Sequence, residues 1–189
     1  MQDYLRLYHL EAYLFGEVTR QFQKDGTLSA FDFFCIVIWK ANRSKSKVAA
    51  RLHKKGHPDL TAAVDALLRG IGSAPDNRSR LGVLIEEWGF RLPMASAVLA
   101  VLYPDEFTVY DVRVCDVLGD FKDAQHKAQF EELWRRYTDY VRAVRATVPG
   151  QLSLREKDRY LWGKSFAEQL ERDIAVGFQK PDPDEELEA

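Results

Sequence analysis

The sequence predicts an all-α fold of about eight helices, and three observations lead to that prediction. Apolar residues recur at spacings of three and four along most of the chain, which is the period of an amphipathic helix. Gly, Pro, Ser and Asp stand where these stretches begin and end. The one extended stretch, residues 107–110, is too short to build a sheet. Unequal helix lengths favour a compact globular assembly over a regular bundle.

Each expected helix has its own periodic stretch and its own boundary residues. In chain order the expected helices span 3–24, 31–40, 44–55, 60–69, 80–88, 93–102, 112–118, 125–146 and 153–174. Ser29 caps the second helix, which is apolar on most faces and is therefore expected in the core. Residues 70–79 are expected to be a mobile loop. Residues 1–175 form one predicted domain, and residues 176–189 a predicted disordered acidic tail.

Composition excludes several classes of protein. Hydrophobic residues make up 46% of the 189 residues and charged residues 30%, which is typical of a globular protein. Two cysteines exclude a disulfide scaffold and a four-cysteine metal or iron–sulfur site. The first residues lack the apolar core of a signal peptide, and the longest apolar run, 94–103, is about half of the ~20 residues that span a bilayer. We therefore expect a cytoplasmic protein without a membrane partner.

Charge is unevenly distributed along the chain, and its location says more than the net charge of −2. That net charge excludes a strongly basic protein that coats nucleic acid, but it does not exclude a local cationic patch. Residues 40–80 hold ten basic and three acidic residues, a local charge of +7, whereas residues 81–125 hold three basic and eight acidic residues, a local charge of −5. We therefore expect one cationic face and salt-sensitive binding.

Part of this cationic charge falls on one side of a predicted helix. Four basic residues have spacings of three and four: Arg43, Lys47, Arg51 and Lys54. One interpretation is an ordinary solvated face, and the other is contact with phosphates. His53 and His57 have the spacing of metal ligands, but Gly56 interrupts the helix and no third ligand is evident, so we expect no metal and no other cofactor.

Residues 103–119 place Asp111 between an extended stretch and a short helix, in the sequence YPDEFTVYDVRVCDVLG. In one interpretation Asp111 only caps the helix by accepting backbone N–H bonds. In the other, its carboxylate also faces a cleft, where it activates water or stabilises a developing cation.

A predicted helix–turn–helix lies just upstream, in residues 88–102, WGFRLPMASAVLAVL. The small residues of its second helix allow another backbone to approach closely, and by themselves they indicate only close packing. In proteins that bind nucleic acid, the free N–H groups at such a helix start also bind phosphate.

Together, residues 88–119 resemble the helix-hairpin-helix superfamily of DNA glycosylases, in particular its 8-oxoguanine-glycosylase-like branch. The resemblance lies in the order of helix, tight turn, small-residue helix, Pro-containing turn, extended VYD and a helix that starts with VRV. Two further stretches agree, FFCIVIWKANRSKSKVAARL at 33–52 and LREKDRYLWGKSF at 154–166, and the second is similar to the C-terminal helix of small bacterial members. The resemblance extends over residues 30–170.

The resemblance implies a helix-hairpin-helix glycosylase-like fold and excision of a modified purine base from DNA. In that family the residue matching Asp111 is the essential carboxylate, which assists cleavage of the N-glycosidic bond after the base is flipped out. The candidates for contact with DNA are Lys40, Arg43, Lys45, Lys47, Arg51, Arg91 and Arg113. The candidates for the base pocket, each also compatible with a core position, are Trp39, Trp88, Tyr110 and Trp162. We expect a monomer that binds duplex DNA.

Two departures from the family's pattern leave alternatives open. GFRLP, residues 89–93, stands where the family has Leu-Pro-Gly-Val-Gly, so the grip on phosphate is expected to be altered or lost. Pro93 or Met94 stands where bifunctional members carry a nucleophilic lysine, which implies a monofunctional enzyme that uses water. Lys40 or Lys164 as an amine from another element is the less favoured route. The departures also motivate an alternative function, a catalytically inactive module that binds nucleic acid or a protein partner.

Overall fold

A computed structural model describes residues 4–147 and 150–178, and every regular element in these ranges is helical, which confirms the all-α prediction. In chain order the α-helices are α1 (Leu5–Tyr8), α2 (Leu10–Tyr13), α3 (Thr19–Asp25), α4 (Ala30–Ala41), α5 (Lys45–His53), α6 (Leu60–Ser73), α7 (Asn77–Gly82), α8 (Leu92–Leu102), α9 (Val112–Leu118), α10 (Phe130–Thr147) and α11 (Leu154–Ala175). Within the described ranges no helix combines the length and apolar character that crossing a bilayer requires.

Four short helical turns of other types join these helices. Two π-helical stretches, Leu14–Val18 and Val83–Glu87, continue α2 and α7. Two 3₁₀ turns, Asn42–Ser44 and Lys122–His126, precede α5 and α10.

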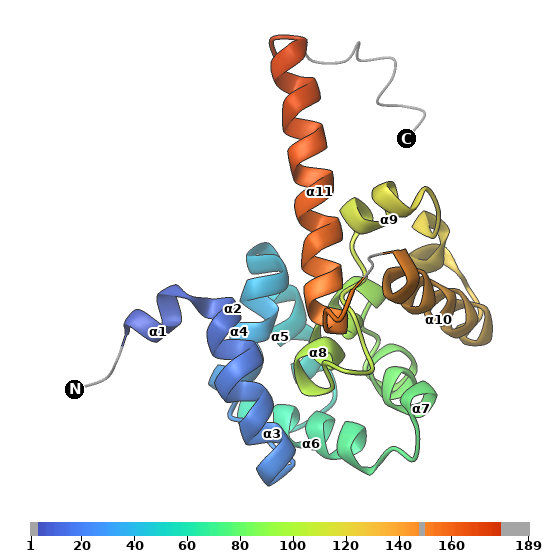
Figure 1. The fold of residues 1–189 in the computed structure, drawn as a ribbon. Coiled ribbons are helices and arrows are strands. Elements are labelled where there is room, and N and C mark those ends of the chain that lie inside the picture. Colours follow the sequence, from blue (N-terminus) through green and yellow to red (C-terminus); the bar gives the residue numbers. More distant parts are fainter. Residues whose placement is uncertain (1–3, 148–149, 179–189) are drawn as a thin grey trace.

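The apolar helix α8 lies at the centre of the fold (Figure 1). Every residue from Leu92 to Leu102 is buried except Pro93. Its small residues allow α4 to pack closely against it, and α3 and α7 also contact it. This buried helix is the scaffold on which the extended segment before α9 is anchored.

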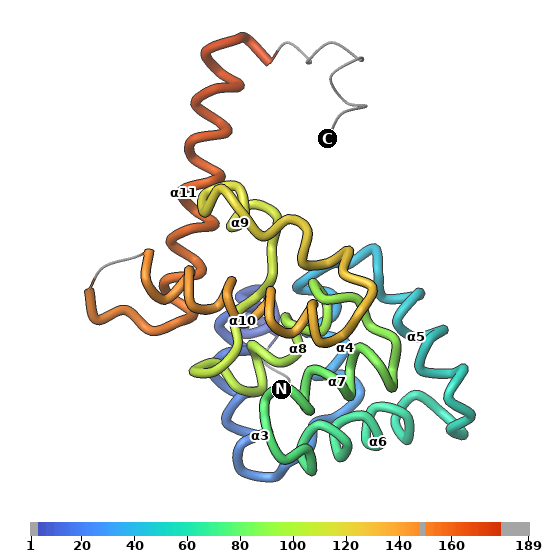
Figure 2. Tube along the Cα trace, turned by 90° about the vertical axis from the view of Figure 1, so that its right-hand side faces the viewer, coloured from blue at the N-terminus to red at the C-terminus, as the bar shows by residue number. Residues whose placement is uncertain are grey.

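Helix α11 runs between two groups of helices (Figure 1). The N-terminal helices α2–α5 lie on one side of it, and α9 and α10 lie on the other. Its first half packs against α9 and α10, and its C-terminal half extends beyond the remaining helices in both views (Figure 2). This path brings the first turns of α11 close to elements that are more than a hundred residues away in the sequence.

Several predicted boundaries agree with the structure. Helix α9 spans the expected residues 112–118, Asp111 is its N-cap, and Gly119 ends it with a left-handed φ of 69°. Ser29 caps α4 by accepting a hydrogen bond from the backbone N–H of Asp32 at 3.1 Å. These boundaries were predictable because a cap is a local interaction.

The expected loop at 70–79 is wrong over most of its length. Helix α6 continues to Ser73, and Asp76 caps α7, so that only residues 74–76 connect the two helices. Ile71 is fully buried, and Gly70 lies so close to α7 and its continuation that a Cβ there would meet Val83 Cγ1 at 3.2 Å. Close packing at Gly70 and Ile71 therefore keeps this end of α6 helical in spite of the low helix propensity of glycine.

Two other helices also differ from the prediction, one by an interruption and one by its first residue. The expected helix at 3–24 is interrupted at His9, whose φ of −94° and ψ of 57° are not helical, and it then runs on through the first π-helical stretch. The helix expected from residue 125 begins at Phe130, because a 3₁₀ turn occupies the preceding residues. Of the predicted acidic tail, residues 179–189 lie outside the described part of the chain.

Candidate active site

Asp111 sits at the end of an extended segment that buried side chains hold in place. The Tyr110 N–H donates to Ser96 Oγ on α8 at 2.9 Å. Two tyrosines of α10 donate their hydroxyls to carbonyls of the same segment, Tyr137 to Thr108 at 2.7 Å and Tyr140 to Val109 at 2.8 Å. The backbone leading to Asp111 is therefore fixed by bonds from α8 and α10, which positions its side chain.

Both oxygens of the Asp111 carboxylate have partners. Oδ1 accepts the backbone N–H of Arg113 at 3.0 Å and so caps α9. Oδ2 accepts a hydrogen bond from Lys40 Nζ at 2.7 Å, and the same ammonium donates to the Tyr110 carbonyl at 3.3 Å. The side chains of Lys40 and Asp111 are 13% and 23% exposed, so the ion pair is partly desolvated and still reaches solvent.

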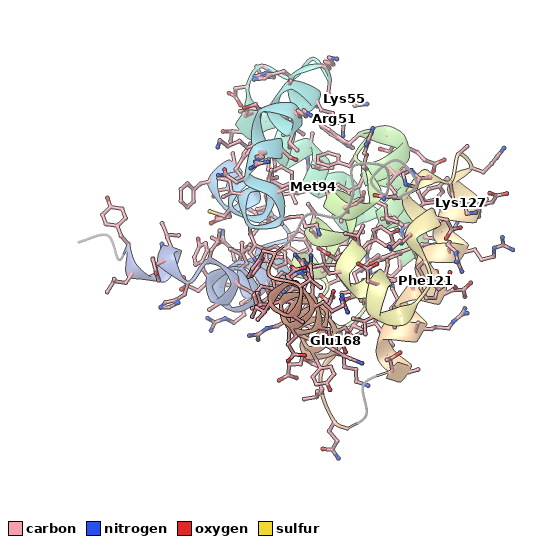
Figure 3. All side chains as sticks on the ribbon, turned by 90° about the horizontal axis from the view of Figure 1, so that it is seen from above. Arg51, Lys55, Met94, Phe121, Lys127 and Glu168 are labelled. Carbon is pink, nitrogen blue, oxygen red and sulfur yellow. The ribbon has the colours of Figure 1, made fainter. Side chains whose placement is uncertain are left out.

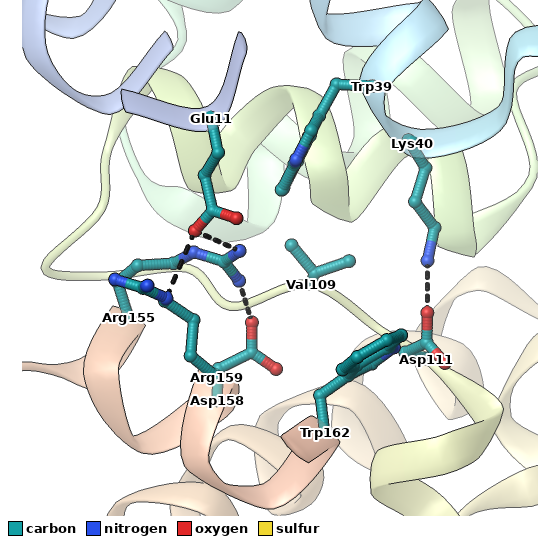
Figure 4. Close-up of a pocket in the computed structure, with 9 residues that line it drawn as sticks. All are labelled: Glu11, Trp39, Lys40, Val109, Asp111, Arg155, Asp158, Arg159 and Trp162. Carbon is teal, nitrogen blue, oxygen red and sulfur yellow. Dashed lines mark hydrogen bonds and ion pairs between the residues drawn. The ribbon is translucent and has the colours of Figure 1, made fainter. Parts of the chain in front are cut away.

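This ion pair opens into a pocket of 660 Å³, a volume typical of small-molecule sites, which range over about 300–1,000 Å³. The lining residues come from α2, α4, the segment before α9, and α11: Glu11, Trp39, Lys40, Val109, Asp111, Arg155, Asp158, Arg159 and Trp162. Figure 4 shows the Lys40–Asp111 pair at one end of the pocket and a cluster around Arg155 at the other. Trp39 lies on the α4 side of the pocket, and Trp162 lies on the α11 side, beside Asp111 in this view.

The cluster around Arg155 joins α2 to α11. The Arg155 guanidinium donates to Glu11 Oε1 at 2.9 Å and to Asp158 Oδ2, and Arg159 Nε lies 3.3 Å from the same Glu11 oxygen. The guanidinium also lies 5.1 Å from the ring centroid of Trp39, within the range of a cation–π contact. These contacts fix Trp39 and Asp158 relative to each other.

Asp158 is a buried acid that lines the pocket. Its side chain is only 3% exposed, and burial raises its pKa to about 6, although the charges of Arg155 and Lys40 act in the opposite direction. Sequence reasoning missed this residue, because it stands among several charged residues of the same helix and its partner Lys40 is distant in the sequence. One signal was present: Leu154, Asp158, Leu161 and Ser165 share the buried face of α11, so an acid stands on an otherwise inward-facing stripe.

The structure brings two of the four predicted aromatic residues into the pocket, Trp39 and Trp162. Trp39 packs edge-to-face on Phe15 with 5.4 Å between ring centroids. Trp162 is 43% exposed, and the Arg113 guanidinium lies 5.5 Å from its ring centroid. Each of these rings has only part of its surface covered by protein, which leaves area for a ligand to contact.

The other two aromatic candidates do not line the pocket. Tyr110 is fully buried, and its hydroxyl donates to the carbonyl of Phe121 at 2.7 Å. Trp88 is 8% exposed and stacks on His57 with 5.8 Å between ring centroids. Tyr110 precedes Asp111 in an extended segment, where consecutive side chains point to opposite sides, so its ring turns into the core.

The predicted cationic residues fall into separate places. Lys40 lies in the pocket, and Arg113 lies over Trp162 and donates to Gln169 Oε1 at 2.6 Å. The remaining candidates lie on α5 and around it, exposed or half-buried: Arg43, Lys45, Lys47, Arg51 and Arg91. The 3₁₀ turn places Arg43 before α5, so the expected helical face starts only at Lys47.

The turn between α7 and α8 lies beside the basic helix α5. The Arg51 guanidinium is 5.7 Å from the ring centroid of Phe90, and a Cβ on the left-handed Gly89 would be 4.0 Å from Arg51 Cδ. Figure 3 shows Arg51 and Lys55 close together at the edge that α5 forms. The start of α8 is a poor anion site, because Pro93 has no N–H and the Met94 N–H donates to the Arg91 carbonyl at 3.1 Å.

Lys164, the other candidate amine, does not line the pocket. It is 47% exposed and lies 3.6 Å from Glu168, one helical turn away. Among the described residues, no group of three or more His, Cys, Asp or Glu side chains is arranged to hold a metal ion. Comparison with protein family models, with curated protein sequences and with solved structures yields no match.

Proposed function

We propose that this protein is a DNA glycosylase that hydrolyses the N-glycosidic bond of a modified purine base, with Asp111 as the essential carboxylate. The observation that carries the proposal is the position of Asp111 at one end of a pocket that two tryptophans flank. A flipped base needs an aromatic surface on which to stack, and such stacking contributes about 1–3 kcal/mol per base. The pocket supplies that surface next to a carboxylate.

The role of the carboxylate follows from the positive charge that develops on the sugar. Glycosidic cleavage passes through a state with oxocarbenium character, and a fixed carboxylate stabilises the positive charge as it forms. Asp111 is fixed by the cap of α9 and by the bonds that hold residues 108–110. It is therefore oriented before substrate binds, which is the arrangement that electrostatic catalysis requires.

The role of Lys40 differs between two possible routes, one with water and one with Lys40 as the nucleophile. With water as the nucleophile, the expected route, the Lys40 ammonium orients Asp111, and the enzyme is monofunctional. With Lys40 itself as the nucleophile, its neutral amine attacks C1′ and the base leaves with the electron pair of the glycosidic bond. The C1′–O4′ bond of the sugar then opens to give an imine, which borohydride reduces to a stable covalent adduct. The 2.7 Å contact with Asp111 favours Lys40 over Lys164 for that second route. Borohydride trapping on lesion DNA, with Lys40→Met as the control, distinguishes the two.

DNA would approach along α5. Five basic residues lie on this helix or just after it: Lys45, Lys47, Arg51, Lys54 and Lys55. Contacts between such side chains and phosphates are independent of sequence and weaken steeply with salt. The proposed DNA partner is therefore held by its backbone, and the damaged base is read in the pocket.

A specific observation also favours the alternative, a catalytically inactive module that binds nucleic acid or a protein partner. Both oxygens of Asp111 are already engaged, by the cap of α9 and by Lys40. In this alternative, the ion pair only stabilises the fold. It predicts salt-dependent DNA binding that Asp111→Asn leaves intact or strengthens, and no release of any base. A helical interaction protein without a role on nucleic acid would not bind DNA even at low salt.

The experiment is base release from duplexes that carry a panel of purine lesions, with wild type, Asp111→Asn and a matched control. The control is Asp59→Asn, because Asp59 also caps a helix, accepting the Ala62 N–H at 2.8 Å, but is exposed and lies outside the pocket. We expect wild type and Asp59→Asn to release one class of base, and Asp111→Asn to be slower by a factor of about 10²–10³. Absence of release by the wild type from every duplex would overturn the proposal.

A further inference from the structure

Three carboxylates line the pocket, those of Glu11, Asp111 and Asp158, and only Asp111 has a place in the proposed function. Asp111 lies at the end occupied by Lys40, and Asp158 lies at the other end beside Arg155 (Figure 4). Trp39 lies on the α4 side of the pocket and Trp162 on the α11 side, so a base stacked on either ring would share the pocket with both Asp111 and Asp158. Paired carboxylates that flank a scissile glycosidic bond divide the work of acid and nucleophilic assistance.

The surroundings of Asp158 suit it to hold a proton. The described charged groups that act on it are Arg155 on its own helix, Lys40 on α4 and Asp111 before α9, with Glu11 and Arg159 beyond Arg155. The titratable groups of α10 that interact with it are the neutral hydroxyls of Tyr137 and Tyr140. Its burial disfavours the carboxylate more than the two cations favour it, and its pKa is raised to about 6. Arg155 engages Oδ2, and Asp158 lines the pocket between Arg155 and Trp162 (Figure 4).

We infer that Asp158 is the general acid that protonates the departing base, an inference that rests on the proposed glycosylase function. The bond between the sugar carbon C1′ and the base nitrogen breaks, and its electron pair goes to the base. The proton on Asp158 Oδ1 is transferred to a ring nitrogen of that base, which leaves neutral. A water oxygen bonds to C1′, its proton passes by way of Asp111 to solvent, and solvent reprotonates Asp158.

The test uses two leaving groups. A neutral purine lesion, such as hypoxanthine or 8-oxoguanine, must gain a proton in order to leave as a neutral base. N7-methylguanine carries a positive charge in DNA and leaves neutral without a proton. We expect Asp158→Asn to slow single-turnover release of the neutral lesion by about 10²–10⁴-fold and to leave release of N7-methylguanine unchanged. Asp65→Asn on α6, which removes a carboxylate from an ion pair outside the pocket, should change neither rate.

A pH profile of the wild type needs no variant and therefore covers the case in which Asp158→Asn does not fold. Release of the neutral lesion should fall about tenfold per pH unit above pH 6, because the proton on Asp158 is lost there. A profile that is flat between pH 6 and 8, or equal losses for both leaving groups in Asp158→Asn, would overturn the inference while the glycosylase function stands. A wild type that releases no base at any pH would instead overturn the proposed function.

Discussion

At the scale of a residue, Asp158 is a pocket side chain whose burial costs folding free energy. Its carboxylate is nearly buried, in contact with a single guanidinium, on a helix face otherwise turned to the interior. Burial of an ionised carboxylate costs free energy unless its partners compensate, and the raised pKa shows that here they do not compensate fully. A purely structural position would be more stable with an apolar side chain.

This cost appears in the pH dependence of stability. The pKa of Asp158 is about 6 in the folded protein, and the ordinary pKa of an aspartate, 3.8, applies to the unfolded chain, so the folded protein binds the proton more tightly. Its contribution therefore favours folding below about pH 4 and is lost as pH rises to 6, a change of about 3 kcal/mol. Urea unfolding of wild type and Asp158→Asn at pH 4–7 measures this change in stability. We expect the unfolding free energy of the wild type to fall relative to that of Asp158→Asn as the pH rises. A difference that stays constant with pH would contradict the raised pKa.

At the scale of elements, α8 provides the close packing on which the site depends. Ala97 is fully buried in α8, and Ser96 beside it accepts the N–H that anchors the segment leading to Asp111. A larger side chain in such a well-packed helix forces its neighbours apart. The geometry of the site is thus tied to small residues that are not part of it.

We therefore expect Ala97→Leu to lower the free energy of unfolding by about 1–3 kcal/mol. The matched control is Ala167→Leu, since Ala167 is exposed on α11 and a leucine there should change stability by no more than about 0.5 kcal/mol. Chemical denaturation monitored by circular dichroism gives both values. Equal stabilities for the two variants would contradict the central position of α8.

The sequence predicted the elements better than the site, and the reason is distance along the chain. The helical period and the caps at Ser29 and Asp111 are set within a few residues, so the sequence alone indicated them. Lys40 and Asp111 are 71 residues apart, and Glu11 and Arg155 are 144 apart, so no spacing rule connects them. The buried positions of Tyr110 and Trp88 likewise depend on neighbours from distant helices.

At the scale of the whole molecule, charge is segregated in space as well as in sequence. Five basic side chains without an acidic neighbour in the sequence lie on α5 or just after it, and Arg51 and Lys55 mark this edge in Figure 3. The pocket lies between α4 and α11. A molecule with a net charge of −2 therefore still has a cationic edge along α5.

This arrangement predicts the salt dependence of DNA binding. Lys47→Ala, on α5, should weaken binding to duplexes of any sequence and reduce the slope of log K against log salt concentration by about 1. Lys24→Ala, on α3 and outside the cationic segment, should leave the slope unchanged. Fluorescence anisotropy over a series of salt concentrations provides both slopes. Identical slopes for wild type and Lys47→Ala would place the DNA elsewhere on the surface.

The most direct test of the account is single-turnover base release by wild type and Asp111→Asn on the same lesion duplex, with Asp59→Asn as the capping control. We expect release by wild type and control, and a rate lower by a factor of about 10²–10³ in Asp111→Asn. Release at the wild-type rate by Asp111→Asn, or no release by wild type from any purine lesion, would contradict a glycosylase that works through Asp111.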